Sequence, residues 1–276
     1  MDSGRKDRVH TGIKNIMQEN QILLTIIMPA LNEEANILHA LNNTLEAFTN
    51  YNIDGEVIVV NDGSKDKTYE IVSNLILQYP DRVRVICHDF PEGIGASFWD
   101  GVENANGKIA CMLPGDNEND PLEILRYMEL LRHVDIVVPF IYNRWSRSLF
   151  RNILSLVYRI IINTTFGVNL NYTNGTVLYR KSVLKDARFM SKGFFFQTDI
   201  LIRLIKKGYL FAEVPYRLGL RKSGVSKAIS FPSLLQVIKG YLLLIQDIYF
   251  ASKVDKDTEG FSADSLSAKR YGVHKK

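Results

Sequence analysis

Cysteine and histidine are both scarce in this chain, and neither is spaced for a metal site or a disulfide framework. The sequence has two cysteines, Cys87 and Cys111, which lie in separate apolar segments and form no Cys-x-x-Cys pair. We therefore predict reduced thiols in a protein core. The five histidines show no metal-ligand spacing, and we assign them no role.

Long apolar runs are also missing. The N-terminal stretch MDSGRKDRVHTG lacks the apolar segment of a signal peptide. No uninterrupted run of about 18 apolar residues, which could cross a bilayer, occurs in the sequence. The longest candidate, LLQVIKGYLLLIQDIYF, is interrupted by Gln236, Lys239, Gln246 and Asp247. We expect it to form a helix that is largely buried or lies on a surface.

Neither sign of charge dominates. The formal net charge is +4, an excess too small to predict a nucleic-acid partner. It suits a phosphate-bearing ligand or an anionic membrane surface. With 46% hydrophobic and 23% charged residues over 276 positions, the chain can form one large globular domain or two small ones.

Predicted strands and helices alternate along residues 23–230. Four apolar runs rich in β-branched residues predict buried strands: LLTIIMP, GEVIVVND, RVRVICHD and KIACML. Segments with helical spacing separate them, and DIVVP, GTVLYR and LFAEVP predict three more strands. This order predicts an α/β fold with a mostly parallel, Rossmann-like sheet flanked by helices. Outside it we expect a mobile arm over 1–22, an apolar helix over 231–251 and a mobile polar tail over 252–276.

A turn motif follows each of the first four strands: PALNE, NDGSKD, EGIGAS and PGDNEND. In a parallel sheet these turns meet at one edge, where ligands bind. The last motif places three acids, Asp116, Glu118 and Asp120, within five residues. Their mutual repulsion leaves two interpretations, a solvated turn or a site for a positively charged group.

Five segments carry a family resemblance. In order they are IIMPALNEEANI, VIVVNDGSKDKT, GIGASFWDGVENANGKIACMLPGDNE, GFFFQTDILIRLIKKGYLFAEVPYR and RKSGVSK. Together they resemble the inverting glycosyltransferases of family 2, which have the GT-A fold. The most similar subgroup is the polyprenyl-phosphate sugar transferases, which include dolichol-phosphate mannose synthase. The resemblance spans residues 23–230.

The resemblance implies a divalent metal, Mg²⁺ or Mn²⁺, on the diphosphate of a nucleotide sugar. Similar proteins carry an Asp-x-Asp-x-Gln motif, whose positions are held here by Pro114, Asp116 and Glu118. One carboxylate is thus lost and one gained. We expect Asp116 and Glu118 to hold the metal, since Mg²⁺ takes one or two protein carboxylates with substrate phosphates.

The resemblance also implies a nucleotide pocket. Asp62 would accept a hydrogen bond from the base, while Asn61 stands where similar proteins have another Asp. Simpler interpretations remain open: Asp62 as a residue stabilising its own turn, and Asn32 as the cap of the next helix. The full set predicted to bind the nucleotide sugar is Pro29, Ala30, Glu33, Asp62, Gly93, Gly95 and Asp116.

The acceptor side is assigned to the second half of the chain. Arg221, Ser226 and Lys227 combine cations with a hydroxyl, as phosphate sites do. Asp199 is interpreted as a general base, an acceptor-orienting residue or a helix cap. The residues predicted to contact the acceptor or a phosphate are Asn174, Gly175, Gln197, Arg221, Ser226 and Lys227.

The sequence thus predicts a metal-dependent inverting transferase that moves a sugar from a UDP- or GDP-sugar to a polyprenyl phosphate, with Asp116, Asp199 and Arg221 as catalytic residues. One alternative is transfer to a sugar hydroxyl in a surface polysaccharide or lipid-linked glycan. Another is a non-catalytic nucleotide-sugar-binding protein. A nucleotidyltransferase is disfavoured, because it would carry a Gly-rich basic loop where this chain has PALNEE.

Residues 148–167, SLFRNILSLVYRIIINTTFG, predict a helix with a strongly apolar face. Three interpretations are open: contact with a membrane, burial in the core, or a dimer interface. We expect a cytoplasmic protein with peripheral contact to the inner face of the cell membrane, and no nucleic-acid partner.

Overall fold

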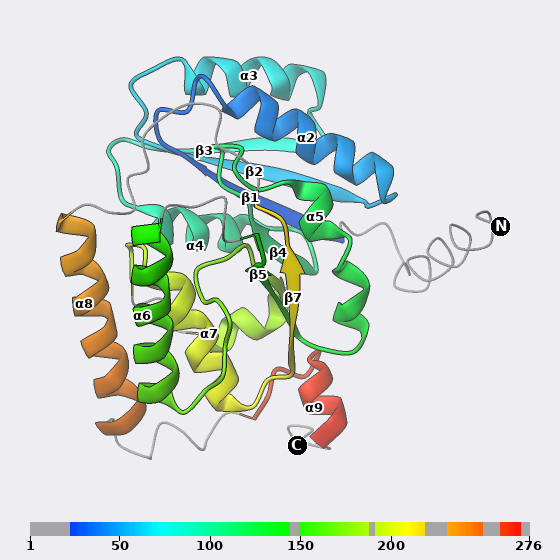
Figure 1. Ribbon diagram of the computed structural model, residues 1–276. Helices are drawn as coiled ribbons and strands as arrows, with labels where there is room; N and C mark the ends of the chain where they lie inside the picture. Colours follow the sequence, from blue (N-terminus) through cyan, green and yellow to red (C-terminus); the bar gives the residue numbers. More distant parts are fainter. Residues whose placement is uncertain (1–22, 144–148, 188–190, 219–230, 251–259, 272–276) are drawn as a thin grey trace.

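The strands of the computed structural model form one seven-stranded sheet. The structure describes residues 23–143, 149–187, 191–218, 231–250 and 260–271. Within them the strand order is β3-β2-β1-β4-β6-β5-β7 (Figure 1). β6 runs antiparallel to both neighbours, and the other pairs are parallel. The predicted mostly parallel sheet is confirmed, with these bounds: β1 Leu24–Ala30, β2 Gly55–Asp62, β3 Val83–His88, β4 Ile109–Met112, β5 Ile136–Ile141, β6 Leu178–Arg180 and β7 Phe211–Tyr216.

Helices cover both faces of the sheet because successive strand residues point to opposite sides. Ile26 and Val57 pack with α2, α3 and α5, whereas Ile27 and Ile58 pack with α4 and α7. Figure 1 shows α2 and α3 above the sheet and α4 below it. The bounds are α2 Ile37–Asn50, α3 Thr68–Gln78, α4 Ile94–Asn104, α5 Pro121–Leu125, η1 Met128–Arg132, α6 Leu149–Phe166, η3 Lys181–Asp186, α7 Phe196–Lys207, α8 Phe231–Ile245, η4 Gln246–Phe250 and α9 Leu266–Tyr271.

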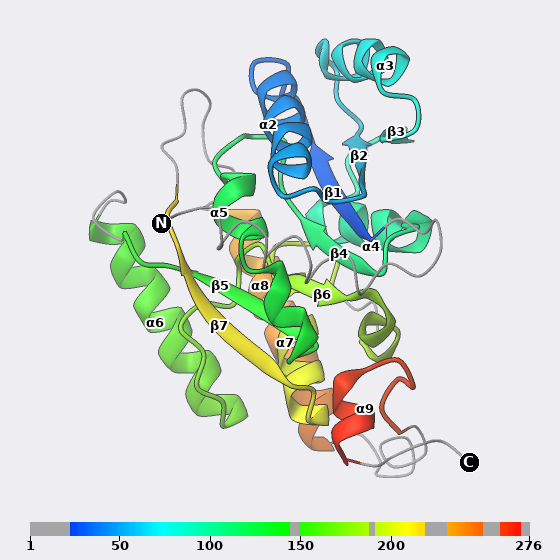
Figure 2. The ribbon, with the colours of Figure 1, turned by 90° about the vertical axis from the view of Figure 1, so that its right-hand side faces the viewer.

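A third apolar cluster joins α6, α7 and α8. Phe166 of α6 packs against Tyr241 of α8 and stacks on Tyr249 of η4. Only Ile162 and Phe166 of α6 are buried, so most of this helix stands outside the core. Figure 2 shows α6 at the end of the molecule opposite α3.

Residues 260–271, which the sequence places in a mobile polar tail, pack on the domain in the structure. Asp135 is fully buried, and its carboxylate accepts hydrogen bonds from the backbone N–H groups of Leu266 and Ser267. Phe261 packs edge-on against Tyr209. A buried carboxylate needs such donors, and the N-terminus of α9 supplies them. Residues 1–22, 251–259 and 272–276 lie outside the described ranges.

Candidate active site

Two loops at the carboxyl ends of β1 and β2 are locked together. Lys65 N–H donates to Asn32 Oδ1 over 2.8 Å, and Asn32 N–H donates to Ser64 Oγ over 3.0 Å. Asn32 has a φ of +54°. It does not cap α2, because that helix begins at Ile37 and Asn36 occupies the cap position. Glu33 lies in the same loop, where its carboxylate accepts from Asn36 Nδ2 over 2.8 Å.

The acidic turn (residues 116–120) begins where β4 leaves β1. Leu113 N–H donates to Ile27 O and Gly115 N–H donates to Pro29 O, over 2.9 and 3.0 Å. A Cβ on Gly115 would lie 2.8 Å from Cδ1 of Ile37, so glycine allows this close approach. The pairing brings Asp116 next to the backbone of Pro29, as expected for neighbouring parallel strands.

The three acids of this turn differ in what they do. Asp120 caps α5, because its Oδ1 accepts from Leu122 N–H over 2.9 Å. Asp116 Oδ1 accepts from Glu118 N–H over 3.1 Å, around Asn117 at a φ of +58°. Asp120 is thus a helix cap, and Asp116 and Glu118 are the candidate metal ligands of the acidic turn.

These two carboxylates fit a metal that completes its coordination with substrate. Both side chains are partly exposed. In the parts of the chain that the structure describes, no group of three His, Cys, Asp or Glu residues is placed to hold an ion. Mg²⁺ and Mn²⁺ accept such a small oxygen set, because phosphates and water fill the other positions.

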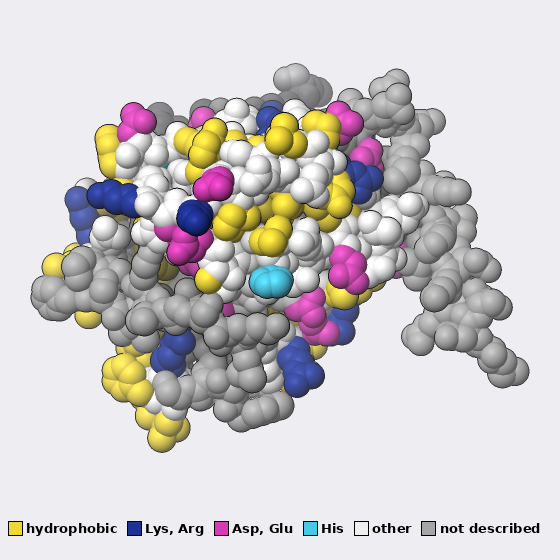
Figure 3. All heavy atoms as spheres, turned by 90° about the horizontal axis from the view of Figure 1, so that it is seen from above, with side chains coloured by type: hydrophobic (Ala, Val, Ile, Leu, Met, Phe, Trp, Pro, Cys, Tyr) yellow, Lys and Arg dark blue, Asp and Glu magenta, His cyan; other side chains and the backbone are white. Residues whose placement is uncertain are grey.

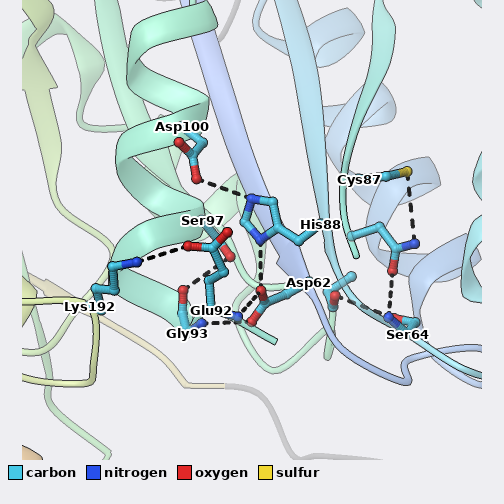
Figure 4. A network of polar contacts seen from close by, with 11 residues as sticks. Asp62, Ser64, Cys87, His88, Glu92, Gly93, Ser97, Asp100 and Lys192 are labelled. Atoms are coloured by element: carbon cyan, nitrogen blue, oxygen red, sulfur yellow. Dashed lines mark hydrogen bonds and ion pairs between the residues drawn. The ribbon is translucent and has the colours of Figure 1, made fainter. Parts of the chain in front are cut away.

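Asp62 is the last residue of β2 and ties three segments together (Figure 4). Its Oδ1 accepts from Glu92 N–H over 2.7 Å and its Oδ2 accepts from Gly93 N–H over 3.0 Å. The ring Nδ1 of His88, at the end of β3, lies 2.8 Å from the same Oδ1. The interpretation of Asp62 as a residue stabilising its own turn is therefore wrong, since it holds the loop before α4.

Gly93 and Gly95 allow a close approach between two backbone segments. Gly93 has a φ of +105°, and a Cβ there would lie 2.6 Å from Lys192 O. Gly95 N–H donates to Lys192 O over 2.8 Å. The neighbour observed at these glycines is the backbone before α7, which closes one side of the Asp62 loop.

The predicted acceptor residues in the middle of the chain gather around the start of α7. Asn174 Oδ1 accepts from Thr198 Oγ1 over 2.9 Å, and Gln197 Nε2 donates to Tyr179 Oη over 2.6 Å. The hydroxyl of Tyr158, from α6, lies 2.8 Å from Thr198 Oγ1. Burial raises the pKa of Tyr158 to about 12, so the phenol stays protonated.

Gly175, another predicted acceptor residue, lies against β5, where a Cβ would be 2.8 Å from Pro139 O. Tyr158 and Thr198 were missed by the sequence analysis. Their signal, a hydroxyl on each of two separate helices, becomes visible only once the helices are placed side by side.

Asp199 lies in the first turn of α7 and is buried. Its Oδ1 accepts from Arg203 Nε over 3.0 Å, and Arg203 Nη1 also pairs with Asp247 of η4. Burial raises the pKa of Asp199 to about 6, although Arg203 opposes the shift. The helix-cap interpretation is wrong because the side chain caps no N–H of α7. Its catalytic role stays a prediction.

Arg221, Ser226 and Lys227 lie outside the described residues. The described segment that precedes them, residues 191–218, ends beside the acidic turn. Tyr216 Oη, at the end of β7, donates to Asn119 Oδ1 over 3.3 Å. Arg217 N–H donates to Glu123 Oε2 over 3.1 Å.

The chain is similar to three proteins that are named for sugar transfer. The dodecaprenyl-phosphate galacturonate synthase of Rhizobium johnstonii is 27% identical over 172 residues, covering 61% of this chain and 51% of that protein. The polyprenol monophosphomannose synthase of Mycolicibacterium smegmatis is 28% identical over 216 residues, covering 73% and 79%. The dolichol-phosphate mannosyltransferase of Pyrococcus furiosus is 26% identical over 213 residues, covering 74% and 58%. The chain thus spans about half the length of the first of these relatives and somewhat more of the third.

The fold has solved counterparts. Glucosyl-3-phosphoglycerate synthase from Mycobacterium tuberculosis, in complex with UDP, superposes with a TM-score of 0.63 at 19% identity, covering 87% of this chain and 83% of that one. The same enzyme with Mn²⁺, UDP and glucosyl-3-phosphoglycerate gives a TM-score of 0.62. The predicted GT-A fold is confirmed. The family model for glycosyl transferase family 2 matches residues 25–188, which include the ends of β1, β2, β3 and β4 described above. The chain therefore belongs to glycosyl transferase family 2 and is a glycosyltransferase.

Proposed function

We propose that this protein transfers a sugar from a nucleoside diphosphate sugar to a polyprenyl phosphate. The observation that carries the proposal is that Asp62, Gly93 and Asp116 gather at one edge of the sheet, within the region matched to the family. The acceptor is supported by three relatives named for polyprenyl or dolichol phosphate products.

The donor would lie across the ends of β1, β2 and β4. Asp62 would receive the base beside the backbone of Pro29 and Ala30. Asp116 and Glu118 would hold Mg²⁺ or Mn²⁺, which when bound would balance the negative charge of the departing diphosphate. These carboxylates follow a strand paired with β1, so base and diphosphate would meet the same edge.

The acceptor phosphate would need little help from a base. It is already anionic, so its oxygen can attack the anomeric carbon without losing a proton first. Catalysis then consists of positioning and charge stabilisation. This agrees with the engagement of Asp199 by Arg203, which leaves that carboxylate in an ion pair. Arg221, Ser226 and Lys227 would bind phosphate oxygens.

A lipid acceptor also suits α6, which Tyr158 connects to Asn174 through Thr198. The helix exposes eight large apolar side chains: Leu149, Phe150, Ile153, Leu154, Leu156, Val157, Ile160 and Ile161. It contains Arg151 and Arg159 and no acid. A basic helix with an exposed apolar face is the pattern of helices that lie on anionic membranes.

We place the membrane contact on α6 for a second reason, the contrast with the opposite end of the molecule. Over α2 and α3, acidic and basic side chains are interspersed with scattered apolar ones (Figure 3). In the described ranges, no helix is both long and apolar enough to cross a membrane. The proposed contact is one in which α6 lies along the surface with its exposed apolar side chains in the bilayer.

Replacing Phe150 and Ile160 together with Glu is expected to weaken binding to phosphatidylglycerol vesicles by at least about tenfold, because two side chains that would enter the bilayer become charged. Both are more than half exposed, at 67% and 54%, so the fold should tolerate the change. Leu77→Glu is the matched control, since Leu77 is 82% exposed on α3. Vesicle co-sedimentation measures the effect.

Binding to phosphatidylglycerol but not to phosphatidylcholine, with loss at high salt, would support the anionic surface. If the double variant co-sediments like the unaltered protein, the membrane proposal fails. The membrane proposal also fails if light scattering shows that the unaltered protein is a dimer and the double variant a monomer, while neither protein binds vesicles. In that case α6 would be an interface between two copies.

Transfer itself is tested by incubating the protein with UDP- and GDP-sugars, Mg²⁺ or Mn²⁺, and a polyprenyl phosphate. We expect release of nucleoside diphosphate that depends on the lipid phosphate, together with a sugar-linked lipid detected by mass spectrometry. Binding without release under all conditions would indicate a non-catalytic nucleotide-sugar-binding protein. Release only with a glycan acceptor would contradict the proposed acceptor.

A further inference from the structure

His88 holds two carboxylates with its two ring nitrogens (Figure 4). It ends β3, and the parallel pairing with β2 places it opposite Asp62. Nδ1 lies 2.8 Å from Asp62 Oδ1, and Nε2 lies 3.1 Å from Asp100 Oδ2. The side chains of His88 and Asp62 are almost fully buried, whereas that of Asp100, on α4, is 41% exposed.

The hydrogen bonds of Asp62 leave one of its oxygens with spare capacity. A carboxylate accepts about four hydrogen bonds, two on each oxygen. Oδ1 accepts hydrogen bonds from the His88 ring and from the N–H of Glu92, whereas Oδ2 accepts one from the N–H of Gly93. Oδ2 can therefore take a further donor, and the orientation of the carboxylate decides whether that oxygen is presented to a ligand.

We propose that His88 is a positioning residue that fixes the Asp62 carboxylate in the orientation in which Oδ2 receives a ring N–H of the nucleobase. The inference rests on the proposed nucleotide-sugar function and adds a residue that touches no substrate. Asp100, on α4, acts indirectly: it orients the imidazole ring of His88, which in turn orients Asp62.

Acidic side chains surround the His88 ring. They are Asp62 from β2, Asp100 from α4 and Glu92 from the intervening loop, and Lys192 in turn pairs with Glu92 over 2.9 Å. An imidazole that donates from both nitrogens satisfies Asp62 and Asp100 together, so the ring is held between two carboxylates and the Asp62 carboxylate cannot turn without losing its donor.

Two substitutions separate the roles of the two nitrogens. His88→Asn places an amide nitrogen near the position of Nδ1 and keeps a donor for Asp62. His88→Gln places it near Nε2 and keeps only the donor for Asp100. His39→Asn is the control, because His39 is exposed on α2. Titration calorimetry with Mn²⁺ would measure the Kd of UDP, GDP and inorganic pyrophosphate for each variant.

We expect His88→Gln to raise the Kd of the preferred nucleoside diphosphate by about tenfold, as for one charge-assisted hydrogen bond. His88→Asn should retain most of the affinity. Pyrophosphate, which has no base, should bind all variants equally. If both His88 substitutions prevent folding, Asp100→Ala tests the same inference at a side chain that is 41% exposed, since loss of the second anchor of the ring should weaken nucleotide binding and leave pyrophosphate binding unchanged.

Nucleotide binding unchanged in His88→Gln would overturn the inference while leaving the proposed function intact. Parallel loss of pyrophosphate binding would also overturn it, because the effect would then be a general disturbance of the site. If the unaltered protein binds pyrophosphate but neither UDP nor GDP, the proposed function itself fails.

Discussion

Replacing Asp116 with Asn is expected to lower the rate of sugar transfer by about 10²- to 10³-fold, because the substitution removes a charged ligand at the point where the diphosphate departs. The side chain is partly exposed in the turn after β4, so the fold should remain. The expected loss is in kcat, measured as nucleoside diphosphate released per enzyme in the presence of polyprenyl phosphate and Mn²⁺.

The control for this substitution lies in the same turn. Asp120→Asn changes the same charge four residues away, at a carboxylate that caps α5. Asn caps helices about as well as Asp does, so little change in activity is expected. If the two variants retain similar activity, Asp116 is not the metal ligand, and the acidic turn is a solvated loop.

Replacing Arg203 with Met is expected to lower the free energy of unfolding by about 3–5 kcal/mol, because it leaves buried Asp199 without its cation. The same guanidinium also pairs with Asp247, so η4 loses its polar link to α7. Urea unfolding measures the change. Lys206→Met is the matched control: Lys206 lies on the same helix and is exposed, so an effect within about 0.5 kcal/mol is expected.

The destabilisation should depend on pH with a definite sign. The pKa of Asp199 is raised by burial to about 6 in the folded protein, above its unfolded value of about 4. The folded state therefore binds this proton more tightly, and the group's contribution to stability is lost as the pH rises from about 4 through about 6. Loss of Arg203 removes the neighbour that lowers this pKa, so the cost should be larger at pH 8 than at pH 5. An equal cost at both pH values would contradict this account.

Asp199→Asn separates stability from catalysis. Arg203 keeps Asp247 as a partner, so the neutral amide should cost less stability than the loss of the arginine. If transfer falls by orders of magnitude in a variant that unfolds like the unaltered protein, the carboxylate is catalytic, as the sequence analysis predicts. Retained transfer would assign Asp199 to packing alone.

The sequence was informative wherever a feature is local or follows from strand order. Apolar β-branched runs bounded by turn residues identified all seven strands of the described sheet. Because parallel strands end at one edge, the convergence of Pro29, Asp62 and Asp116 could be predicted without coordinates. The antiparallel direction of β6 has no such local signal, and the sequence analysis did not specify it.

Features that depend on distant residues escaped the sequence. α9 is a short helix in a mostly polar stretch of the sequence. It is held by Asp135, which lies 131 residues from Leu266 along the chain. His88 belongs to no recognisable sequence motif. Its position between Asp62 and Asp100 follows from the register of β2 and β3 and from the placement of α4. The link from Arg203 to Asp247 joins two helices that no pattern pairs.

The central claim is that the acidic turn shares a divalent ion with a nucleoside diphosphate, and anomalous diffraction from a crystal soaked with Mn²⁺ and UDP or GDP tests it most directly. We predict an anomalous peak in contact with the Asp116 carboxylate and the diphosphate oxygens, with the base against Asp62. A nucleotide bound at the strand ends with no manganese at this turn would contradict the claim.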